Sequence, residues 1–210
     1  MILQIAFDRM LDVSESLIRP YVYDPLVRFE FGTPIIAEFG YSNVRRQFDY
    51  IPVGKIYVDT KTIDFHEREV AGLRGQGFRL CSFLMGSEHK ALRAIACSPL
   101  FSEMEIWIST MGVPLRYLHE EALAVSQLGY THFIAHGHGI DLTDAFDDMM
   151  RRHDVLRAIS NSRVILAGGI TLDRMDRIMP LKPDAIIVGR GITEMTSPLL
   201  ALKDFRKCLL

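Results

Sequence analysis

The residues best suited to chemistry lie in one short stretch, Val58-Asp59-Thr60-Lys61-Thr62-Ile63-Asp64. An apolar run at 55–58 precedes it and is typical of a buried strand, so the charged groups fall where that strand should end. Side chains alternate across a strand, which predicts that Asp59 and Lys61 point the same way. Carboxylates beside an ammonium are costly to desolvate. Two interpretations follow: a structural ion pair, or a catalytic lysine poised by acids, with or without a metal.

Composition narrows the class of protein. The chain has 210 residues, of which 49% are hydrophobic and 24% charged, which is ordinary for a globular domain. Its formal net charge of -2 favours neither nucleic acid nor an anionic membrane as a partner. Three widely spaced cysteines without a CxxC motif indicate reduced thiols and a cytoplasmic protein. The apolar N-terminal run is short and is interrupted by Asp8, so we expect no signal peptide and no transmembrane helix.

Eight short apolar runs, each followed by a stretch of helical character, organise the chain. Strands are predicted at 2–7, 27–31, 55–58, 78–83, 105–109, 132–135, 164–167 and 184–188. Helices are predicted at 12–20, from 34 onward, and at 64–73, 88–96, 114–128, 142–159, 172–179 and 198–207. Ser87 is a candidate helix cap, and the charged run 144–154 is interpreted as a solvated helix face. This alternation predicts an α/β fold, a single-domain (β/α)8 TIM barrel over 1–210. An open doubly wound sheet is the alternative, but no GxGxxG motif follows the first strand.

Polar residues recur at the carboxyl ends of these strands, where barrels of this kind place their catalytic groups. Asp8 follows the first strand, Glu30 lies near the end of the second, and His136 follows the sixth. Glu30 and Asp59 end neighbouring strands and could meet at one hard divalent cation, and two carboxylates with water and substrate oxygens suit Mg²⁺. Lys61 would then be placed to stabilise an oxyanion or move a proton.

Glycine-rich loops follow the last two predicted strands. Gly168 and Gly169 follow the seventh, and Gly189-Arg190-Gly191 follows the eighth. Such loops expose backbone N–H groups, and each precedes a helix whose N-terminus favours an anion. The loops after strands seven and eight often form the phosphate site of these barrels, and Arg190 could add a bidentate contact. We therefore expect these two loops to bind a phosphate.

These motifs resemble the orotidine 5'-monophosphate decarboxylase suprafamily. The resemblance is closest to the branch that contains 3-hexulose-6-phosphate synthase and 3-keto-L-gulonate-6-phosphate decarboxylase, and it covers nearly the whole chain. Its most specific element is the Asp-x-Lys-x-x-Asp motif at Asp59, Lys61 and Asp64. The segments 4–8 and 29–34 and the two glycine loops complete it in order.

The resemblance implies roles for these residues. Glu30 and Asp59 would be Mg²⁺ ligands, Lys61 would contact an enediolate oxygen, and Asp8 would contact the substrate. Asp64 would reach across a homodimer interface into the partner's site, and the glycine loops would hold the sugar phosphate. The implied activity is that of a carbon–carbon lyase acting through the 1,2-enediolate of a phosphorylated ketose.

Local details favour one activity within this branch. The segment His138-Gly139-Ile140-Asp141 resembles the synthase loop, and the arginines of the decarboxylase are absent. We therefore expect an aldol reaction of ribulose 5-phosphate with formaldehyde. Decarboxylation of 3-keto-L-gulonate 6-phosphate is the second interpretation and orotidine monophosphate decarboxylation the third. A non-catalytic sugar-phosphate binding protein is the alternative of another class.

Two positions depart from the family pattern. Trp107 is aligned with the acid of the fifth strand, and Glu105 shares its face of the strand two residues earlier. The loop after the sixth strand carries an extra residue, so His136 or His138 could be the family's histidine. His136 continues the strand more directly and is preferred as the catalytic residue.

Overall fold

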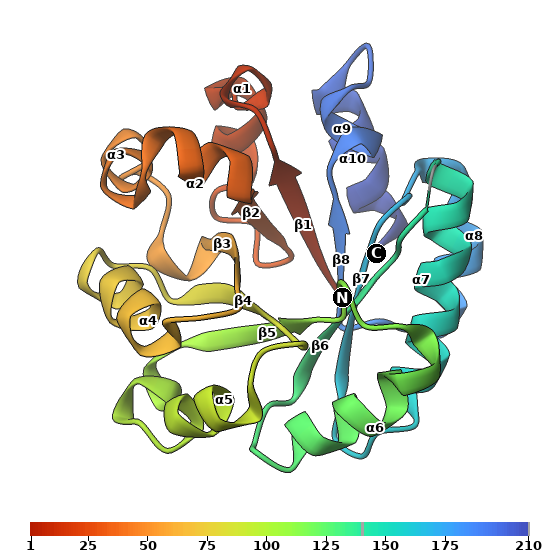
Figure 1. Ribbon diagram of the computed structural model, residues 1–210. Coiled ribbons are helices and arrows are strands. Elements are labelled where there is room, and N and C mark those ends of the chain that lie inside the picture. Colours follow the sequence, from red (N-terminus) through yellow and green to blue (C-terminus); the bar gives the residue numbers. More distant parts are fainter. Residues whose placement is uncertain (140, 210) are drawn as a thin grey trace.

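The computed structural model describes residues 1–139 and 141–209, with the side chain of Leu142 left aside. Ile140, which belongs to the loop compared above with the synthase, lies outside the described residues. The described chain forms a closed barrel of eight parallel strands in sequential order (Figure 1). The strands are β1 (Ile2–Phe7), β2 (Val27–Phe31), β3 (Ile56–Thr62), β4 (Leu80–Leu84), β5 (Glu105–Ser109), β6 (His132–His136), β7 (Arg163–Ala167) and β8 (Ala185–Val188).

Helices surround the barrel on its outside (Figure 1). They are α1 (Glu15–Ile18), α2 (Thr33–Phe39), α3 (Tyr41–Gln47), α4 (His66–Gly75), α5 (His89–Ala96), α6 (Leu115–Ser126), α7 (Leu142–Arg157), α8 (Met175–Ile178), α9 (Arg190–Thr193) and α10 (Pro198–Cys208). The predicted (β/α)8 fold is confirmed. None of the helices in the described part of the chain is long and apolar enough to cross a membrane.

Two local predictions were wrong. The helix expected at 12–20 is broken into the single turn of α1 and a 3-10 turn at Arg19–Tyr21, because Pro20 lacks the amide that would continue the α-helix. Ser87 does not cap α5, which begins after Glu88. The Ser87 hydroxyl instead donates to the Leu84 carbonyl (2.7 Å) and contacts His66 Nε2 (3.0 Å).

The core has two parts, because alternate strand residues point outward to the helices or inward to the barrel axis. The outward residues are large and aliphatic or aromatic, and they form the continuous layer beneath the helices. A smaller cluster fills the barrel interior; its buried members are Tyr57, Leu80, Trp107, Ile134, Ile165, Ala167 and Ala185. The barrel is therefore packed through its centre and leaves room for a site only at its ends.

The charged run 144–154 on α7 is only in part the solvated face that its composition suggested, since other charged residues of the run are buried. Asp148, Arg152 and His153 are all buried, with exposed fractions of 8%, 5% and 4%. Phe146 and Met149 are buried beside them. One face of α7 therefore places charged groups against the barrel, where each needs a partner.

Candidate active site

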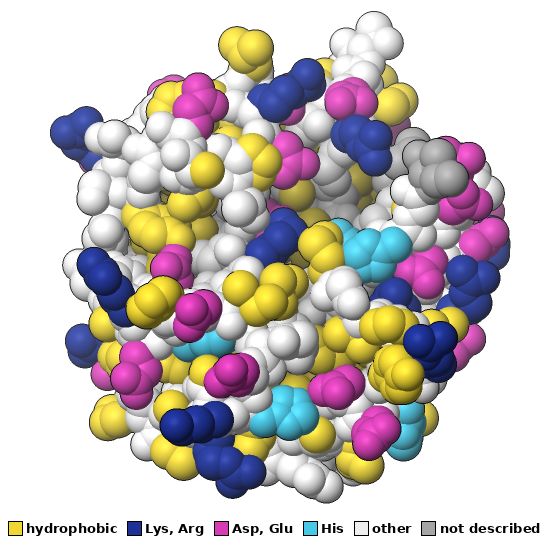
Figure 2. All heavy atoms as spheres, viewed as in Figure 1, with side chains coloured by type: hydrophobic (Ala, Val, Ile, Leu, Met, Phe, Trp, Pro, Cys, Tyr) yellow, Lys and Arg dark blue, Asp and Glu magenta, His cyan; other side chains and the backbone are white. Residues whose placement is uncertain are grey.

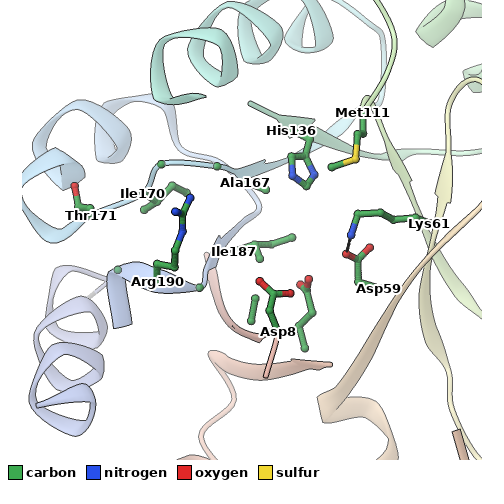
Figure 3. Close-up of a pocket in the computed structure, with 16 residues that line it drawn as sticks. Asp8, Asp59, Lys61, Met111, His136, Ala167, Ile170, Thr171, Ile187 and Arg190 are labelled. Carbon is green, nitrogen blue, oxygen red and sulfur yellow. Dashed lines mark hydrogen bonds and ion pairs between the residues drawn. The ribbon is translucent and has the colours of Figure 1, made fainter. Parts of the chain in front are cut away.

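A cavity of about 220 Å³ lies at the carboxyl ends of the strands and is visible as a hollow in the surface (Figure 2 and Figure 3). It is the end of the barrel at which enzymes of this fold have their active sites. Ten residues singled out from the sequence line it: Asp8, Glu30, Asp59, Lys61, His136, Gly168, Gly169, Gly189, Arg190 and Gly191. The remaining lining residues are Ala6, Met111, Ala167, Ile170, Thr171 and Ile187.

Lys61 and Asp59 form an ion pair at the end of β3, inside this cavity (Figure 3). The Lys61 ammonium also donates to Thr33 Oγ1 (3.2 Å), while Ser82 Oγ donates to the other Asp59 oxygen (2.7 Å). The Lys61 backbone is left-handed, with φ of 48°, a conformation that costs a non-glycine residue energy and is often retained at functional sites. The pair is thus held from both sides and faces the cavity.

Glu30 is buried beside this pair, with 6% of its surface exposed. Burial, reinforced by the nearby Asp59 carboxylate, raises the pKa of Glu30 to about 8. The Gln4 side-chain amide donates to Glu30, while Gln4 Oε1 is buried with no hydrogen-bond partner in the described structure. Burial also raises the pKa of Asp8. Two carboxyl groups, those of Glu30 and Asp59, are therefore buried where little water can solvate them, which favours a bound cation.

The donor set fits a hard divalent metal ion. Glu30 and Asp59 offer carboxylate oxygens, and the unpartnered Gln4 carbonyl oxygen lies on the side chain that already contacts Glu30. Among the residues that the structure describes, no group of three or more His, Cys, Asp or Glu side chains is gathered to hold a metal alone. A cation here would therefore draw further oxygen ligands from water or substrate, as Mg²⁺ commonly does.

The opposite wall of the cavity is formed by the loops after β7 and β8. Gly168 and Gly169 have φ of 108° and 65°, a left-handed conformation that suits glycine. Arg174 donates to the Gly169 carbonyl (2.7 Å) and so fixes this loop. The helices that follow the two loops are single turns, so any anion affinity must come mainly from backbone amides and from Arg190, which extends from α9 toward Ile170 (Figure 3).

His136 and Met111 close the side of the cavity formed by β5 and β6 (Figure 3). Burial lowers the pKa of His136 to about 4, so its imidazole is neutral at physiological pH. His138 stacks on His136 with ring centroids 5.8 Å apart, but it is exposed and does not line the cavity. Of the two candidate histidines, His136 is the one placed at the site.

Asp64 lies outside the cavity and is exposed on the loop before α4. It neighbours Ile63 and Phe65, whose side chains are 57% and 71% exposed. Phe65 is left-handed as well, with φ of 54°. Within one chain, therefore, Asp64 does not join the group formed by Asp59 and Lys61.

The structure places Trp107 in the barrel interior, away from the cavity. Trp107 is 1% exposed and packs against Tyr57 in a tilted arrangement, with ring centroids 4.7 Å apart. Glu105 lies two residues before Trp107 and further from the cavity. It accepts hydrogen bonds from Arg28 (2.8 Å) and from Trp107 Nε1 (2.8 Å). Alternation along β5 places Ser109 at its rim end, so this strand brings no acid to the cavity.

Some site residues were missed by sequence reasoning. Met111 lines the cavity although nothing distinguishes it from the other methionines, and Ser82 and Thr33 contact Asp59 or Lys61. Only Thr33 carried a signal, since it precedes Pro34 directly after a strand. The rest depend on strand register, which sets which residues of β3 and β4 are neighbours.

The protein is thus a (β/α)8 barrel whose cavity has acidic residues and a lysine on one side and two glycine loops on the other. No family model matches the chain. It is 28% identical over 208 residues to 3-hexulose-6-phosphate synthase 1 of Staphylococcus saprophyticus, covering 99% of this chain and 98% of that protein.

Solved structures share the fold over the full length. A 3-hexulose-6-phosphate synthase from Salmonella typhimurium superposes with a TM-score of 0.84 at 21% identity, covering 100% of this chain and 98% of the other. A 3-keto-L-gulonate-6-phosphate decarboxylase from Vibrio cholerae superposes with a TM-score of 0.71 at 19% identity, covering 99% of this chain and 96% of the other. An orotidine 5'-monophosphate decarboxylase from Sulfolobus solfataricus superposes with a TM-score of 0.69 at 15% identity, covering 99% of each chain.

Over its full length, therefore, the chain is similar in sequence to a 3-hexulose-6-phosphate synthase, and it shares its fold with solved structures of 3-hexulose-6-phosphate synthase, 3-keto-L-gulonate-6-phosphate decarboxylase and orotidine 5'-monophosphate decarboxylase.

Proposed function

We propose that this protein is a metal-dependent carbon–carbon lyase that joins ribulose 5-phosphate to formaldehyde, the reaction of a 3-hexulose-6-phosphate synthase. The observation that carries the proposal is one cavity that combines Glu30, Asp59 and Lys61 with the two glycine loops. Full-length similarity to a named synthase supports the same activity. The cavity offers separate places for the two ends of a phosphorylated ketose.

The residues divide the work along the substrate. The loops at Gly168 and Gly189, with Arg190, would hold the phosphate, and Asp8 would contact the sugar hydroxyls. Loss of a proton from C1 of the ketose gives the 1,2-enediolate, whose C1 then attacks formaldehyde. One carbon–carbon bond forms, and the formaldehyde oxygen takes up a proton to give a hexulose phosphate.

Lys61 and His136 face the reacting carbons. The Lys61 ammonium would hydrogen-bond the enediolate oxygen and stabilise its negative charge. His136, neutral because burial lowers its pKa, would accept or donate a proton without adding a charge to the site. A divalent ion held by Glu30 and Asp59, which we propose to be Mg²⁺, would supply further positive charge to the enediolate oxygens.

The second candidate function is decarboxylation of 3-keto-L-gulonate 6-phosphate through the same enediolate. It is less well supported, because the described part of the β6 loop, His136-Gly137-His138-Gly139, places glycine and histidine where that enzyme has arginine. A non-catalytic sugar-phosphate binder is disfavoured as well, since binding phosphate requires neither a buried Glu30 nor a strained Lys61.

The test is an assay with ¹³C-labelled formaldehyde and ribulose 5-phosphate, with Mg²⁺ and after chelation. We expect the label to appear in a hexulose phosphate by NMR and to depend on the metal. If no labelled hexulose forms in either condition, the synthase proposal is wrong. Release of CO₂ from 3-keto-L-gulonate 6-phosphate in a parallel assay would then favour the decarboxylase.

We further propose a homodimer in which Asp64 completes the partner's site. The proposal is supported by the exposure of Ile63 and Phe65 on either side of Asp64, and by the position of Asp64 away from its own cavity. The left-handed Phe65 is a strained conformation that an interface would help to retain. A reducing, cytoplasmic compartment is also proposed, consistent with the free thiols of Cys81, Cys97 and Cys208.

A further inference from the structure

A buried ion pair lies on the inner face of α7, behind the candidate site. Arg152 Nε donates to Asp148 Oδ2 (2.7 Å), and the two side chains are only 6% and 12% exposed. Burial acts to raise the pKa of Asp148, but hydrogen bonds from Arg152 and from the His138 amide outweigh it and hold that pKa below its usual value. Both partners are therefore charged in the folded protein.

The remaining hydrogen bonds of this pair go to two loops at the catalytic rim. Arg152 Nη1 donates to the carbonyl oxygens of Thr110 (3.1 Å) and Val113 (2.9 Å), in the loop after β5. Asp148 Oδ2 accepts from the His138 amide (3.0 Å), in the loop after β6. One ion pair thus joins both loops to the same helix.

Each of these loops carries a residue that lines the cavity. Met111 lies between the two carbonyls that Arg152 binds, and His136 lies two residues before the amide that Asp148 binds. The loops are also joined directly, since the His136 amide donates to Thr110 Oγ1 (3.1 Å). The ion pair therefore lies one layer behind the wall formed by Met111 and His136.

The loop after β6 lies directly on α7. A Cβ added to Gly137 would be 1.8 Å from the Ala145 carbonyl oxygen, so only glycine allows this approach. With helix and loop backbones in contact, the place of Asp148 and Arg152 on α7 sets where the loop runs.

We propose that Asp148 and Arg152 are positioning residues of the active site, which hold Met111 and His136 in place opposite Lys61. The proposal rests on the proposed function for what these residues act on. A buried ion pair is often no more stabilising than apolar residues of similar size, so its contribution here is to the geometry of the loops. Reactive groups need such a supporting layer, because an error of about 1 Å can cost on the order of 100-fold in rate.

The test is Arg152→Met, with Arg151→Met as the matched control. Arg151 is the preceding residue, but its side chain is 62% exposed and lies 3.7 Å from Asp148 Oδ1. For R152M we expect kcat to fall about tenfold or more, with KM for ribulose 5-phosphate within about threefold, because the phosphate loops follow β7 and β8. R151M should retain both values. A folded R152M whose kcat stays within about twofold of wild type overturns the proposal.

Arg152→Lys is the conservative variant, and it decides the question if R152M does not fold. Lysine retains the charge next to Asp148 but has a single nitrogen in place of the guanidinium fork. We expect its kcat to be several-fold below that of the wild type. A kcat equal to that of the wild type shows that the carbonyl contacts do not matter and overturns the proposal.

A readout independent of turnover separates this proposal from the proposed function. With ¹³C-methyl methionine, the Met111 signal, assigned through Met111→Leu, should shift or broaden in R152M. The signal of Met195, which is exposed near the end of α9, should not change. An unchanged Met111 signal overturns the positioning role. If the wild type forms no hexulose phosphate, the proposed reaction is wrong, while this signal still tests whether Arg152 positions the loop.

Discussion

At the scale of single residues, the site combines acidic and basic side chains whose burial costs free energy unless they are paired. Glu30 and Asp59 are buried acids, and Lys61 is the cation that contacts one of them. Without that ammonium or a metal, the two carboxylates would repel each other in a region with little water. The ion pair considered at the outset therefore lies in the cavity, and on the proposed function Lys61 would have a catalytic role as well.

Replacing Lys61 tests this assignment. Lys61→Ala should lower kcat by about 100-fold or more, because the hydrogen bond to the enediolate oxygen and its charge are lost. Binding of ribulose 5-phosphate should change less, since the phosphate loops are untouched. Steady-state kinetics with labelled formaldehyde and calorimetry measure the two effects. Lys203→Ala, an exposed lysine on α10, is the control; normal turnover in Lys61→Ala would contradict the assignment.

The raised pKa of Glu30 predicts a pH dependence for the metal-free protein. Because the folded-state pKa is about 8 and the ordinary value is 4.5, the folded state binds the proton more tightly. Stability should therefore be greatest below about pH 4.5 for this group and fall between pH 4.5 and 8, by at most about 1.4 kcal/mol per unit.

Glu30→Gln removes the ionisable group and should flatten that slope. Urea denaturation at several pH values, with metal chelated, compares the variant with the wild type. Equal slopes in the two proteins would show that Glu30 does not carry the shifted pKa. With metal present, affinity should rise with pH up to about 8, since the ion competes with the proton.

Some residues of the candidate site could be predicted from local sequence patterns, and others could not. Asp59 and Lys61 meet in the cavity, as expected, although β3 is irregular there, with a register shift between Val58 and Thr62. Trp107 lies in the barrel interior, because side chains on one face of β5 lie at different depths along the barrel axis. Met111 had no distinguishing pattern, and its place follows from a loop path set by Arg152.

At the scale of elements, the loop after β7 is shaped by its glycines. Gly168→Ala should destabilise the protein by about 1–3 kcal/mol, because φ of 108° is unfavourable for alanine. The new Cβ would also lie 3.0 Å from the Gly137 carbonyl oxygen. Ribulose 5-phosphate should bind more weakly. Urea denaturation and calorimetry measure both effects.

Gly72→Ala is the matched control for this substitution. Gly72 lies within α4, and a Cβ there would meet nothing within 4 Å. Alanine should therefore stabilise the helix by about 0.5–1 kcal/mol and leave phosphate binding unchanged. If the two variants behave alike, the Gly168 conformation is not needed for the site.

Element order was predictable, while the role of α7 was not. Strand and helix alternate so regularly that the barrel follows from connection rules alone. The run 144–154 mixes acids and bases around the helix, so composition does not indicate which face meets the barrel. Asp148 and Arg152 find buried partners only because the loops after β5 and β6 place backbone groups against them.

At the scale of the whole molecule, the proposed dimer can be tested by complementation. Lys61→Ala and Asp64→Asn should each be nearly inactive alone. Mixed after mild dissociation, half of the dimers would pair the two variants and hold one complete site, restoring about a quarter of the wild-type activity. No recovery, with mixed dimers shown to form, would place Asp64 outside the partner's site.

The tilted aromatic pair of Tyr57 and Trp107 has a consequence for how molecules enter and leave the barrel. It belongs to the buried layer that separates the catalytic cavity from a smaller one lined by Arg28 and Glu105, and the two share no lining residue. The candidate site is thus closed off from the other end of the barrel. On the proposed function, the hexulose phosphate must leave by the route through which the ketose enters, and it uses the same phosphate loops. Product and ketose therefore exclude each other, which makes product inhibition competitive with ribulose 5-phosphate.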